Sequence, residues 1–265
     1  MELDEVGAET NANLATNKSR RASNNKEIDW TTYALKYDLM CDFIPAYQDN
    51  IDLLVKHLGG WRLPEEANIC DLGAGTGNFI TAMAKTLPNA KFTHVDSDVG
   101  MSSFALKKYQ RNCIKNFEII NQSVFTLELG ESSIDVIILI NSLYAMSPQS
   151  AVLKRVKKWL KPSGKLFVID WGRENRILDW GWYIAKNAIS NHGITKTVSA
   201  FIEGAEVIRQ NRLGKKGHKS GKFWRHTTQE FKQMLEEEGF VVEHLDVCYR
   251  GYSDLAICHI AEGSK

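Results

Sequence analysis

The stretch from Asn68 to Phe79, which reads NICDLGAGTGNF, constrains the fold more than any other part of the chain. It predicts a short buried strand, a turn with glycine at every second position, and the start of a helix. Glycine lacks a Cβ atom, so it adopts positive φ angles readily and lets the backbone approach a ligand closely. The N-terminus of the following helix offers unpaired backbone N–H groups. Together these features predict a binding site for a nucleoside cofactor.

Two acidic residues make this prediction more specific. Asp71 lies directly before the glycine turn. Asp96 lies roughly 20 positions beyond the turn, which is the spacing expected for a carboxylate that binds a ribose.

The spacing of the glycines separates two families that use this architecture. Dinucleotide-binding proteins carry G-x-G-x-x-G, in which the third glycine allows close packing of the helix. Residues 71–77 read DLGAGTG instead, which resembles the first motif of class I S-adenosylmethionine-dependent methyltransferases of the small-molecule type. The resemblance covers residues 28–172 well and the remainder loosely.

This resemblance implies that S-adenosylmethionine is the cofactor. In that family the acidic residue that closes the second strand, here Asp96 with Ser97 beside it, accepts hydrogen bonds from both ribose hydroxyls. The glycine turn approaches the amino-acid part of the cofactor, through positions that correspond here to Asp71, Gly73, Ala74 and Gly75.

Further cofactor contacts are implied outside the turn. After the strand expected at 117–120 the family usually has an aspartate near the adenine, and this chain has Ser123 in that place. Its hydroxyl can accept from the exocyclic amino group, and Val124 can offer a backbone N–H to the ring. Tyr33 and Tyr37 resemble the tyrosines that close over the cofactor, although their i, i+4 spacing equally suits core packing.

Strands and helices alternate through the middle of the chain, which predicts a parallel sheet with helices on both faces. We expect an α/β fold with a Rossmann-like, seven-stranded, mostly parallel sheet, an N-terminal helical cover and a lid inserted after the fifth strand. Thr227 and Glu230 have capping-box spacing at the start of a late helix that ends at Gly239. The expected strands are residues 69–71, 91–95, 117–120, 135–140, 165–170, 241–245 and 255–260.

The expected organisation has five parts. Residues 1–26 are polar and lack periodicity, which predicts a disordered tail. Residues 27–66 form a helical cover that includes a helix near 46–58. The remaining parts are a cofactor-binding core at 67–172, a substrate lid at 173–224, and the last helix with the closing strands of the core at 225–265.

Methyl transfer is an in-line displacement, so such a protein mainly supplies proximity and alignment. A general base matters for a weakly acidic hydroxyl and less for an amine. Asn141 follows the fourth strand and is expected to line the methyl-transfer site, with capping of the strand end as the alternative. Asp170, which closes the fifth strand, and His226, which could equally be a helix-entry residue, are the catalytic candidates. Further base candidates are Arg173, His192 and His218.

The segment between Gly172 and Trp224, at about fifty residues, is too long for a plain connection. Its first half is aromatic, and its second half is basic and glycine-rich. Aromatic rings can hold a planar substrate or a cationic amine, and the basic half can close over a carboxylate or phosphate. The alternative is helix packing followed by a solvated loop. The expected substrate contacts are Tyr144, Trp171, Arg173, Trp182, Tyr183 and Tyr252.

The composition limits the partners. The net charge is +1, from 33 Lys and Arg against 32 Asp and Glu, so no global field attracts nucleic acid or an anionic membrane. No apolar run approaches the roughly 18 residues of a membrane span, and the five cysteines show no metal-ligand spacing. We expect a cytoplasmic protein with reduced cysteines, no metal and a small-molecule substrate. The sequence carries no signal for an oligomeric state.

The sequence therefore predicts a methyltransferase that moves a methyl group from S-adenosylmethionine to an N or O nucleophile of a small molecule, in specialised metabolism. One alternative is a protein that binds this cofactor without transferring its methyl group and works through partners. The intact turn with Asp96 disfavours this alternative, because a non-catalytic partner would not need it. The other alternative, an NAD-dependent reductase, is disfavoured by the glycine spacing.

Overall fold

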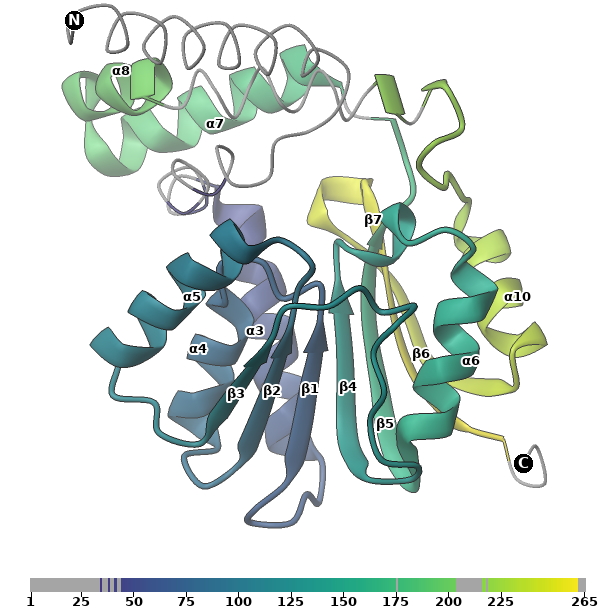
Figure 1. Ribbon diagram of the computed structural model, residues 1–265. Coiled ribbons are helices and arrows are strands. Elements are labelled where there is room, and N and C mark those ends of the chain that lie inside the picture. Colours follow the sequence, from purple (N-terminus) through teal and green to yellow (C-terminus); the bar gives the residue numbers. More distant parts are fainter. Residues whose placement is uncertain are drawn as a thin grey trace, which may run out of the picture.

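The computed structural model describes Ala34, Asp38, Cys41 and residues 44–174, 176–203, 216–217 and 219–261 (Figure 1). The described residues form a seven-stranded sheet in the order β3-β2-β1-β4-β5-β7-β6. Helices cover both faces of this sheet (Figure 1). The predicted α/β fold with a Rossmann-like, mostly parallel sheet is thereby confirmed.

The elements have the following bounds. The strands are β1 (Asn68–Leu72), β2 (Lys91–Val95), β3 (Phe117–Ile120), β4 (Ile134–Ile140), β5 (Leu160–Trp171), β6 (Phe240–Cys248) and β7 (Ser253–Ile260). The helices are α3 (Pro45–Gly60), α4 (Asn78–Thr86), α5 (Val99–Arg111), α6 (Gln149–Trp159), α7 (Ile177–His192), α8 (Ile194–Glu203) and α10 (Thr228–Glu237). Two short 3₁₀ helices are η1 (Leu143–Ala145) and η2 (Tyr249–Gly251).

The order of the strands reverses between β1 and β4. β1 pairs in parallel with β2 on one side and with β4 on the other, whereas β7 runs antiparallel to both β5 and β6. In open α/β sheets ligands bind outside the carboxyl ends of the strands at such a reversal. The turn after β1 and the segment after β4 therefore frame the candidate site.

The strand β4 shows how the sequence builds both layers. All seven of its residues are buried, as expected for a parallel strand with helices on both faces. Because side chains alternate along a strand, Ile137 and Leu139 pack in the cluster beneath α6 and α10. Val136 and Ile138 pack in the cluster with α3, α4 and α5.

Several element ends differ from the expected ones. α3 continues through Gly59 and Gly60, where neither glycine has a positive φ to break the helix. β5 begins at Leu160 instead of Lys165, because the fully buried Leu160 pairs with Ile134 before the pairing shifts at an irregularity in the strand. α6 begins at Gln149, directly after Pro148, whose ψ of 137° is extended.

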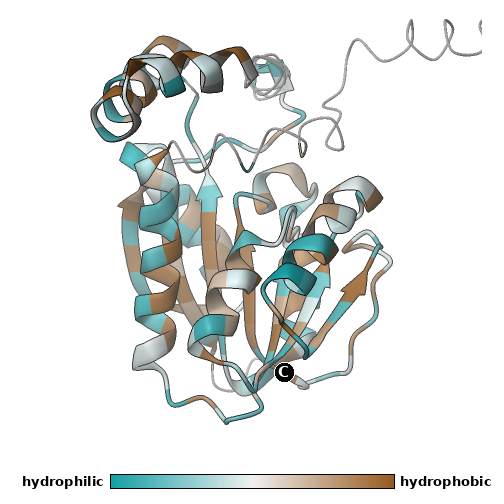
Figure 2. Ribbon diagram, turned by 90° about the vertical axis from the view of Figure 1, so that its left-hand side faces the viewer, coloured by the Kyte–Doolittle hydropathy of each residue, from teal (hydrophilic) through white to brown (hydrophobic). Residues whose placement is uncertain are grey.

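The insertion after β5 contains a pair of helices, α7 and α8, which contact each other and are joined by Gly193. Both lie beyond the carboxyl ends of the strands (Figures 1 and 2). Trp180 and Ile184 of α7 are buried against Tyr252, which precedes β7, so α7 is anchored to the sheet. Among the described helices, none combines the length and apolar character that crossing a membrane requires.

Candidate functional site

The glycine turn between β1 and α4 has the predicted backbone geometry. Gly73, Gly75 and Gly77 have φ angles of 77°, 57° and 76°. A Cβ on Gly73 would lie 2.5 Å from the Cβ of Ser142, and one on Gly77 would lie 2.4 Å from the hydroxyl of Tyr109. A Cβ on Gly75 would meet nothing within 4 Å. Two of the glycines therefore allow close packing within the protein, and Gly75 faces open space.

Asp96 holds this turn in place from the end of β2. One of its carboxylate oxygens accepts from the N–H of Gly75 at 2.8 Å, and the other accepts from the N–H of Asp98 at 2.8 Å. The N–H groups of Gly73 and Ala74 both donate to the carbonyl of Val95. The turn is therefore fixed by β2 through its backbone and through one side chain.

Asp71 is a buried carboxyl group beneath the turn. It is 1% exposed, and its Oδ2 atom has no hydrogen-bond partner. Burial raises its pKa well above the usual value, and the nearby charge of Asp96 adds to this effect. Burial also raises the pKa of Asp96, against the opposing effect of its backbone hydrogen bonds. A cation placed between Asp71 and Asp96 would favour the charged form of both carboxyl groups and lower the pKa of each.

The residues after β3 form a tight turn. The carbonyl of Ser123 accepts from the N–H groups of Thr126 and Leu127, and its hydroxyl accepts from the N–H of Phe125 at 3.3 Å. Val124 is buried. The adenine contacts expected of Ser123 and Val124 stay predictions. Phe125, 38% exposed beside them, is an aromatic side chain that the sequence argument passed over.

The segment after β4 contacts the carboxyl end of β1. Asn141 has a φ of 52°, in the left-handed region that non-glycine residues rarely adopt, and its N–H donates to the carbonyl of Ile169 at 2.7 Å. Its side-chain oxygen accepts from the hydroxyl of Ser253 at 3.5 Å. The hydroxyl of Ser142 donates to the carbonyl of Leu72 at 2.8 Å. Unusual backbone geometry of this kind concentrates at functional sites, and the role expected of Asn141 stays a prediction.

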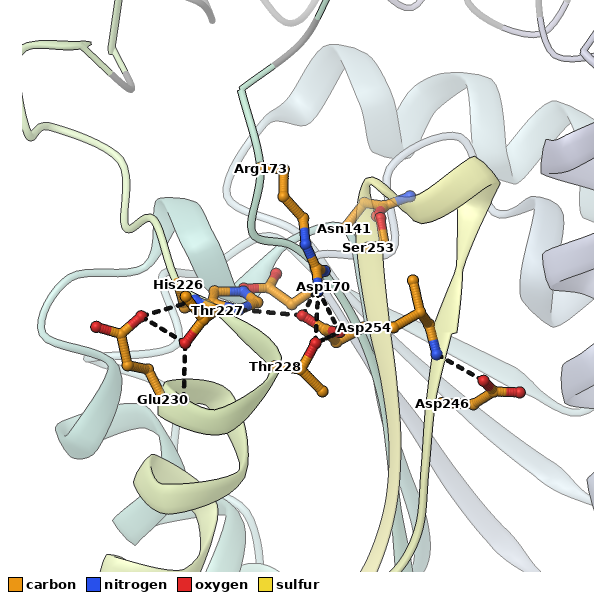
Figure 3. A network of polar contacts seen from close by, with 11 residues as sticks. Asn141, Asp170, Arg173, His226, Thr227, Thr228, Glu230, Asp246, Ser253 and Asp254 are labelled. Carbon is orange, nitrogen blue, oxygen red and sulfur yellow. Dashed lines mark hydrogen bonds and ion pairs between the residues drawn. The ribbon is translucent and has the colours of Figure 1, made fainter.

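A buried network of charges lies beside Asn141, where β5 ends and β7 begins (Figure 3). The ring of His226 lies between two carboxylates, with Nε2 3.4 Å from Asp170 and Nδ1 3.4 Å from Asp254; all three side chains are inaccessible to solvent. Arg173 binds Asp254 through two N–H groups at 2.5 and 2.8 Å, and also donates to Thr228. The remaining oxygen of Asp170 accepts from the backbone N–H of Tyr144 at 3.0 Å.

The carboxylates keep His226 protonated. Burial by itself lowers the pKa of an imidazole, but the contacts with Asp170 and Asp254 outweigh it and raise the pKa of His226 to about 9. Burial raises the pKa of Asp170, although the contact with His226 acts to lower it. Burial by itself would raise the pKa of Asp254 as well. The contacts with His226 and Arg173 outweigh burial and hold the pKa of Asp254 below the usual value.

Four of the aromatic residues expected to bind substrate fall into two groups. Trp171 and Tyr252 stack with ring centroids 5.5 Å apart, and both pack against Trp180. The ring of Tyr183 lies under the guanidinium of Arg250 at 4.0 Å. Trp182, in contrast, is 73% exposed on the opposite side of α7 and takes no part in this cluster.

Asp38 is a contact that the sequence argument missed. Its carboxylate accepts from the hydroxyl of Thr76 at 2.6 Å and from the side chain of Asn78 at 3.1 Å, and it pairs with Lys108 at 2.7 Å. It thus joins the N-terminal part of the chain to the glycine turn. Only the sequence Tyr37-Asp38, next to a predicted cofactor contact, could have drawn attention to it.

The other predicted residues are distributed as follows. Ser97 is exposed beside Asp96. Tyr33, Tyr37 and His218 lie outside the described residues, as does the side chain of His192. His94 is fully buried and contacts the hydroxyls of Tyr109 and Ser102. All five cysteines are free.

A family model described as a methyltransferase domain matches residues 63–239. Demethylmenaquinone methyltransferase of Lactobacillus johnsonii is 27% identical over 216 residues, which cover 77% of this chain and 84% of that protein. Phosphoethanolamine N-methyltransferase 1 of Triticum aestivum is 26% identical over 176 residues, 64% of this chain and 32% of that protein. Carboxy-S-adenosyl-L-methionine synthase of Staphylococcus epidermidis is 25% identical over 128 residues, 48% of this chain and 54% of that protein. This chain thus spans about a third and about half of the last two relatives.

Solved structures share the fold. A SAM-dependent methyltransferase from Aquifex aeolicus superposes with a TM-score of 0.54 at 19% identity, covering 78% of this chain and 88% of that one. An O-methyltransferase family protein from Burkholderia thailandensis superposes with a TM-score of 0.55 at 13% identity, covering 86% of this chain and 60% of that one. At these identities the likeness supports the architecture alone.

We expect Gly73→Ala to lower the free energy of unfolding by about 1–3 kcal/mol, because the new Cβ needs strained backbone and overlaps Ser142. Gly59→Ala is the matched control, since its Cβ would have open space and its φ is not positive. Urea denaturation followed by circular dichroism measures both. Equal effects of the two substitutions would contradict the close packing of the turn against Ser142.

His226→Gln should lower the free energy of unfolding by roughly 3–5 kcal/mol, because it leaves the buried Asp170 without its cation, whereas Asp254 keeps Arg173. The control is His259→Gln, which removes a half-exposed imidazole paired with Glu243 and should cost about 1 kcal/mol or less. A cost below 1 kcal/mol at His226 would argue against a buried imidazolium.

The stability that His226 contributes should also depend on pH. Its pKa in the folded state, about 9, lies above the value of about 6.5 for an unfolded chain. The contribution is therefore fully present below about pH 6.5 and is lost as the pH rises through about 9. Denaturation at pH 6, 7.5 and 9.5 should show that the difference in the free energy of unfolding between wild type and His226→Gln shrinks as the pH rises. A constant difference across this range would rule out the titration.

Proposed function

Because this chain belongs to the methyltransferase-domain family, within the class I S-adenosylmethionine-dependent methyltransferases, we propose that it transfers a methyl group from S-adenosylmethionine to a nucleophile of a small molecule. The observation that carries the proposal is the glycine turn with Asp71 below it and Asp96 beside it. No residue of this chain has to activate the methyl group, because S-adenosylmethionine supplies it already bonded to a positively charged sulfur.

The residues at the turn fit this cofactor. Its amino-acid part carries an ammonium group, and the buried Oδ2 of Asp71 lacks a partner. The open space at Gly75 leaves room for a ligand against the backbone. Asp96 uses one lone pair of each oxygen for the backbone, and a carboxylate oxygen can accept further hydrogen bonds. We therefore propose Asp71, Gly73, Ala74, Gly75 and Asp96 as cofactor-binding residues.

The charge network bears on the choice of nucleophile. A protonated imidazole has no lone pair, so His226 cannot take a proton from a substrate below about pH 9. Asp170 is fully buried and already contacts His226 and the N–H of Tyr144. We propose that these two residues position the segment after β4, with Asn141 and Tyr144, and do not act as the general base. This favours a nitrogen nucleophile, which needs a base less than a hydroxyl does.

The insertion is proposed as the substrate lid. The cluster of Trp171 and Tyr252 adjoins Asp170 and Ser253 at the end of the sheet, so it can form one wall of an acceptor site. Tyr183 and Arg250 extend this wall. Arg173 is held by Asp254, so we propose that it supports the wall and does not bind substrate. Trp182 faces away, and a substrate contact there would need the lid to move.

Measurements of cofactor binding and of methyl transfer distinguish two other functions from the proposed one. A protein that binds S-adenosylmethionine without transferring its methyl group would show affinity without turnover. An NAD-dependent reductase would bind NAD more tightly than S-adenosylmethionine. Titration calorimetry with S-adenosylmethionine and with NAD separates the cofactors. Incubation with labelled S-adenosylmethionine and a metabolite extract, followed by mass identification of the labelled product, would name the acceptor; absence of S-adenosylmethionine binding would overturn the proposal.

Asp96→Asn should weaken S-adenosylmethionine binding by roughly 10- to 100-fold, because hydrogen bonds to a charged group contribute about 1.5–3 kcal/mol. Asp52→Asn, on an exposed position of α3, is the control and should leave the affinity unchanged. Calorimetry gives both affinities, and circular dichroism verifies folding. Equal affinities for the two variants would contradict the assignment of Asp96.

A further inference from the structure

The helices α7 and α8 carry a concentrated apolar surface. Six of the eleven large hydrophobic side chains that are exposed among the described residues lie on these two helices. We call these six residues the outer face. They are Leu178, Trp182 and Ile189 of α7, with exposures of 90%, 73% and 45%, and Ile194, Val198 and Ile202 of α8, with exposures of 68%, 53% and 72%.

α7 is apolar on two sides. Its inner side, with Trp180, Ile184 and Ala188, is buried against the rest of the protein. A helix on the surface of a protein in water typically has one apolar side that faces the core, and polar residues on the opposite side. Leu178 and Trp182 occupy the opposite side instead. Exposed apolar surface of this extent marks an interaction site.

The side chains on α8 form a single stripe. Residues four apart lie on the same side of a helix, and Ile194, Val198 and Ile202 follow this spacing. α8 packs beside α7. Both helices lie beyond the carboxyl ends of the strands, and Figure 2 shows brown, hydrophobic segments along them.

Exposed basic side chains share the insertion with the outer face. Arg176, Lys186, Lys196 and Lys216 are exposed on the same insertion. Asp179, the acidic residue in the first turn of α7, is engaged by Arg250 and Tyr252. Residues 209–222 contain six Lys or Arg and no Asp or Glu. The net charge of +1, which disfavoured an anionic membrane as a partner, is the sum over the whole chain. The insertion itself is strongly basic.

We propose that the outer face docks on an anionic phospholipid surface. Helices that lie in the membrane interface carry aliphatic side chains and tryptophan on one side and lysines on the polar side. The long stems of lysine let the charge reach the headgroups while the apolar side chains enter the acyl boundary. A second copy of the chain would have to bring the same basic insertion against itself. This docking does not depend on methyl transfer, and it would bring the carboxyl edge of the sheet close to molecules carried in the lipid.

Vesicle flotation of the full chain tests the proposal. The probes are vesicles of phosphatidylcholine alone and of an equimolar mixture with phosphatidylglycerol. We expect binding to the mixed vesicles at least about tenfold tighter than to the neutral ones, and weakened by salt. Replacing Lys186 and Lys196 by Gln should weaken the binding about fivefold per lysine.

The matched variants separate the outer face from general hydrophobicity. Ile194→Gln, Val198→Gln and Ile202→Gln together should abolish flotation, whereas Leu106→Gln with Val241→Gln, exposed to 39% and 41% elsewhere, should leave it unchanged. Circular dichroism verifies folding, and the two lysine substitutions decide the question if the triple variant loses helix. Titration with S-adenosylmethionine should give one affinity throughout, so failure to dock is distinguishable from failure of the proposed cofactor site.

Three results would overturn the proposal. The first is no binding of the wild type to mixed vesicles. The second is equal binding to neutral and mixed vesicles. The third is a dimer in size-exclusion chromatography that the triple variant abolishes, which would make the outer face an interface between copies of the chain.

Discussion

A protonated imidazole between two buried carboxylates holds together the end of the sheet where the site lies. Asp170 belongs to β5, Asp254 to β7, and His226 to the segment that enters α10, so one buried cation joins three parts of the chain. A carboxylate that has left water costs several kcal/mol unless a partner compensates it. The insertion leaves the sheet next to Arg173 and returns at His226, whose N–H donates to the carbonyl of Gly172, so the same network closes the base of the insertion.

The glycine turn depends on a second fixed arrangement. Asp96 and the carbonyl of Val95 hold its backbone from β2, while Ser142 presses against Gly73 from the segment after β4. The turn therefore has its shape before any ligand arrives, and pre-formed sites lose less entropy on binding. Asp38 adds a contact from the N-terminal part of the chain to Thr76, so that part contacts the glycine turn directly.

The insertion shows two kinds of apolar side chain with different consequences. Trp180 packs inward on Trp171 and Tyr252, which anchors α7 to the sheet and shapes one wall of the proposed acceptor site. Trp182, two residues later, faces outward with Leu178. The aromatic content of this segment therefore serves internal packing on one side of the helix, and on the other side it remains available to an external surface.

The sequence by itself determined the features that depend on neighbours in the chain. The glycine spacing at residues 73–77, the capping box at Thr227 and the apolar run of β4 are local signals, and the structure confirms all three. Only the tertiary structure decided the partners of Arg173 and Asp254, which are 81 positions apart, and the enclosure of His226. The spacing of polar residues carries no information about which of them meet across a sheet. Burial and charge pairing, which set their pKa values, arise only when distant strands come together.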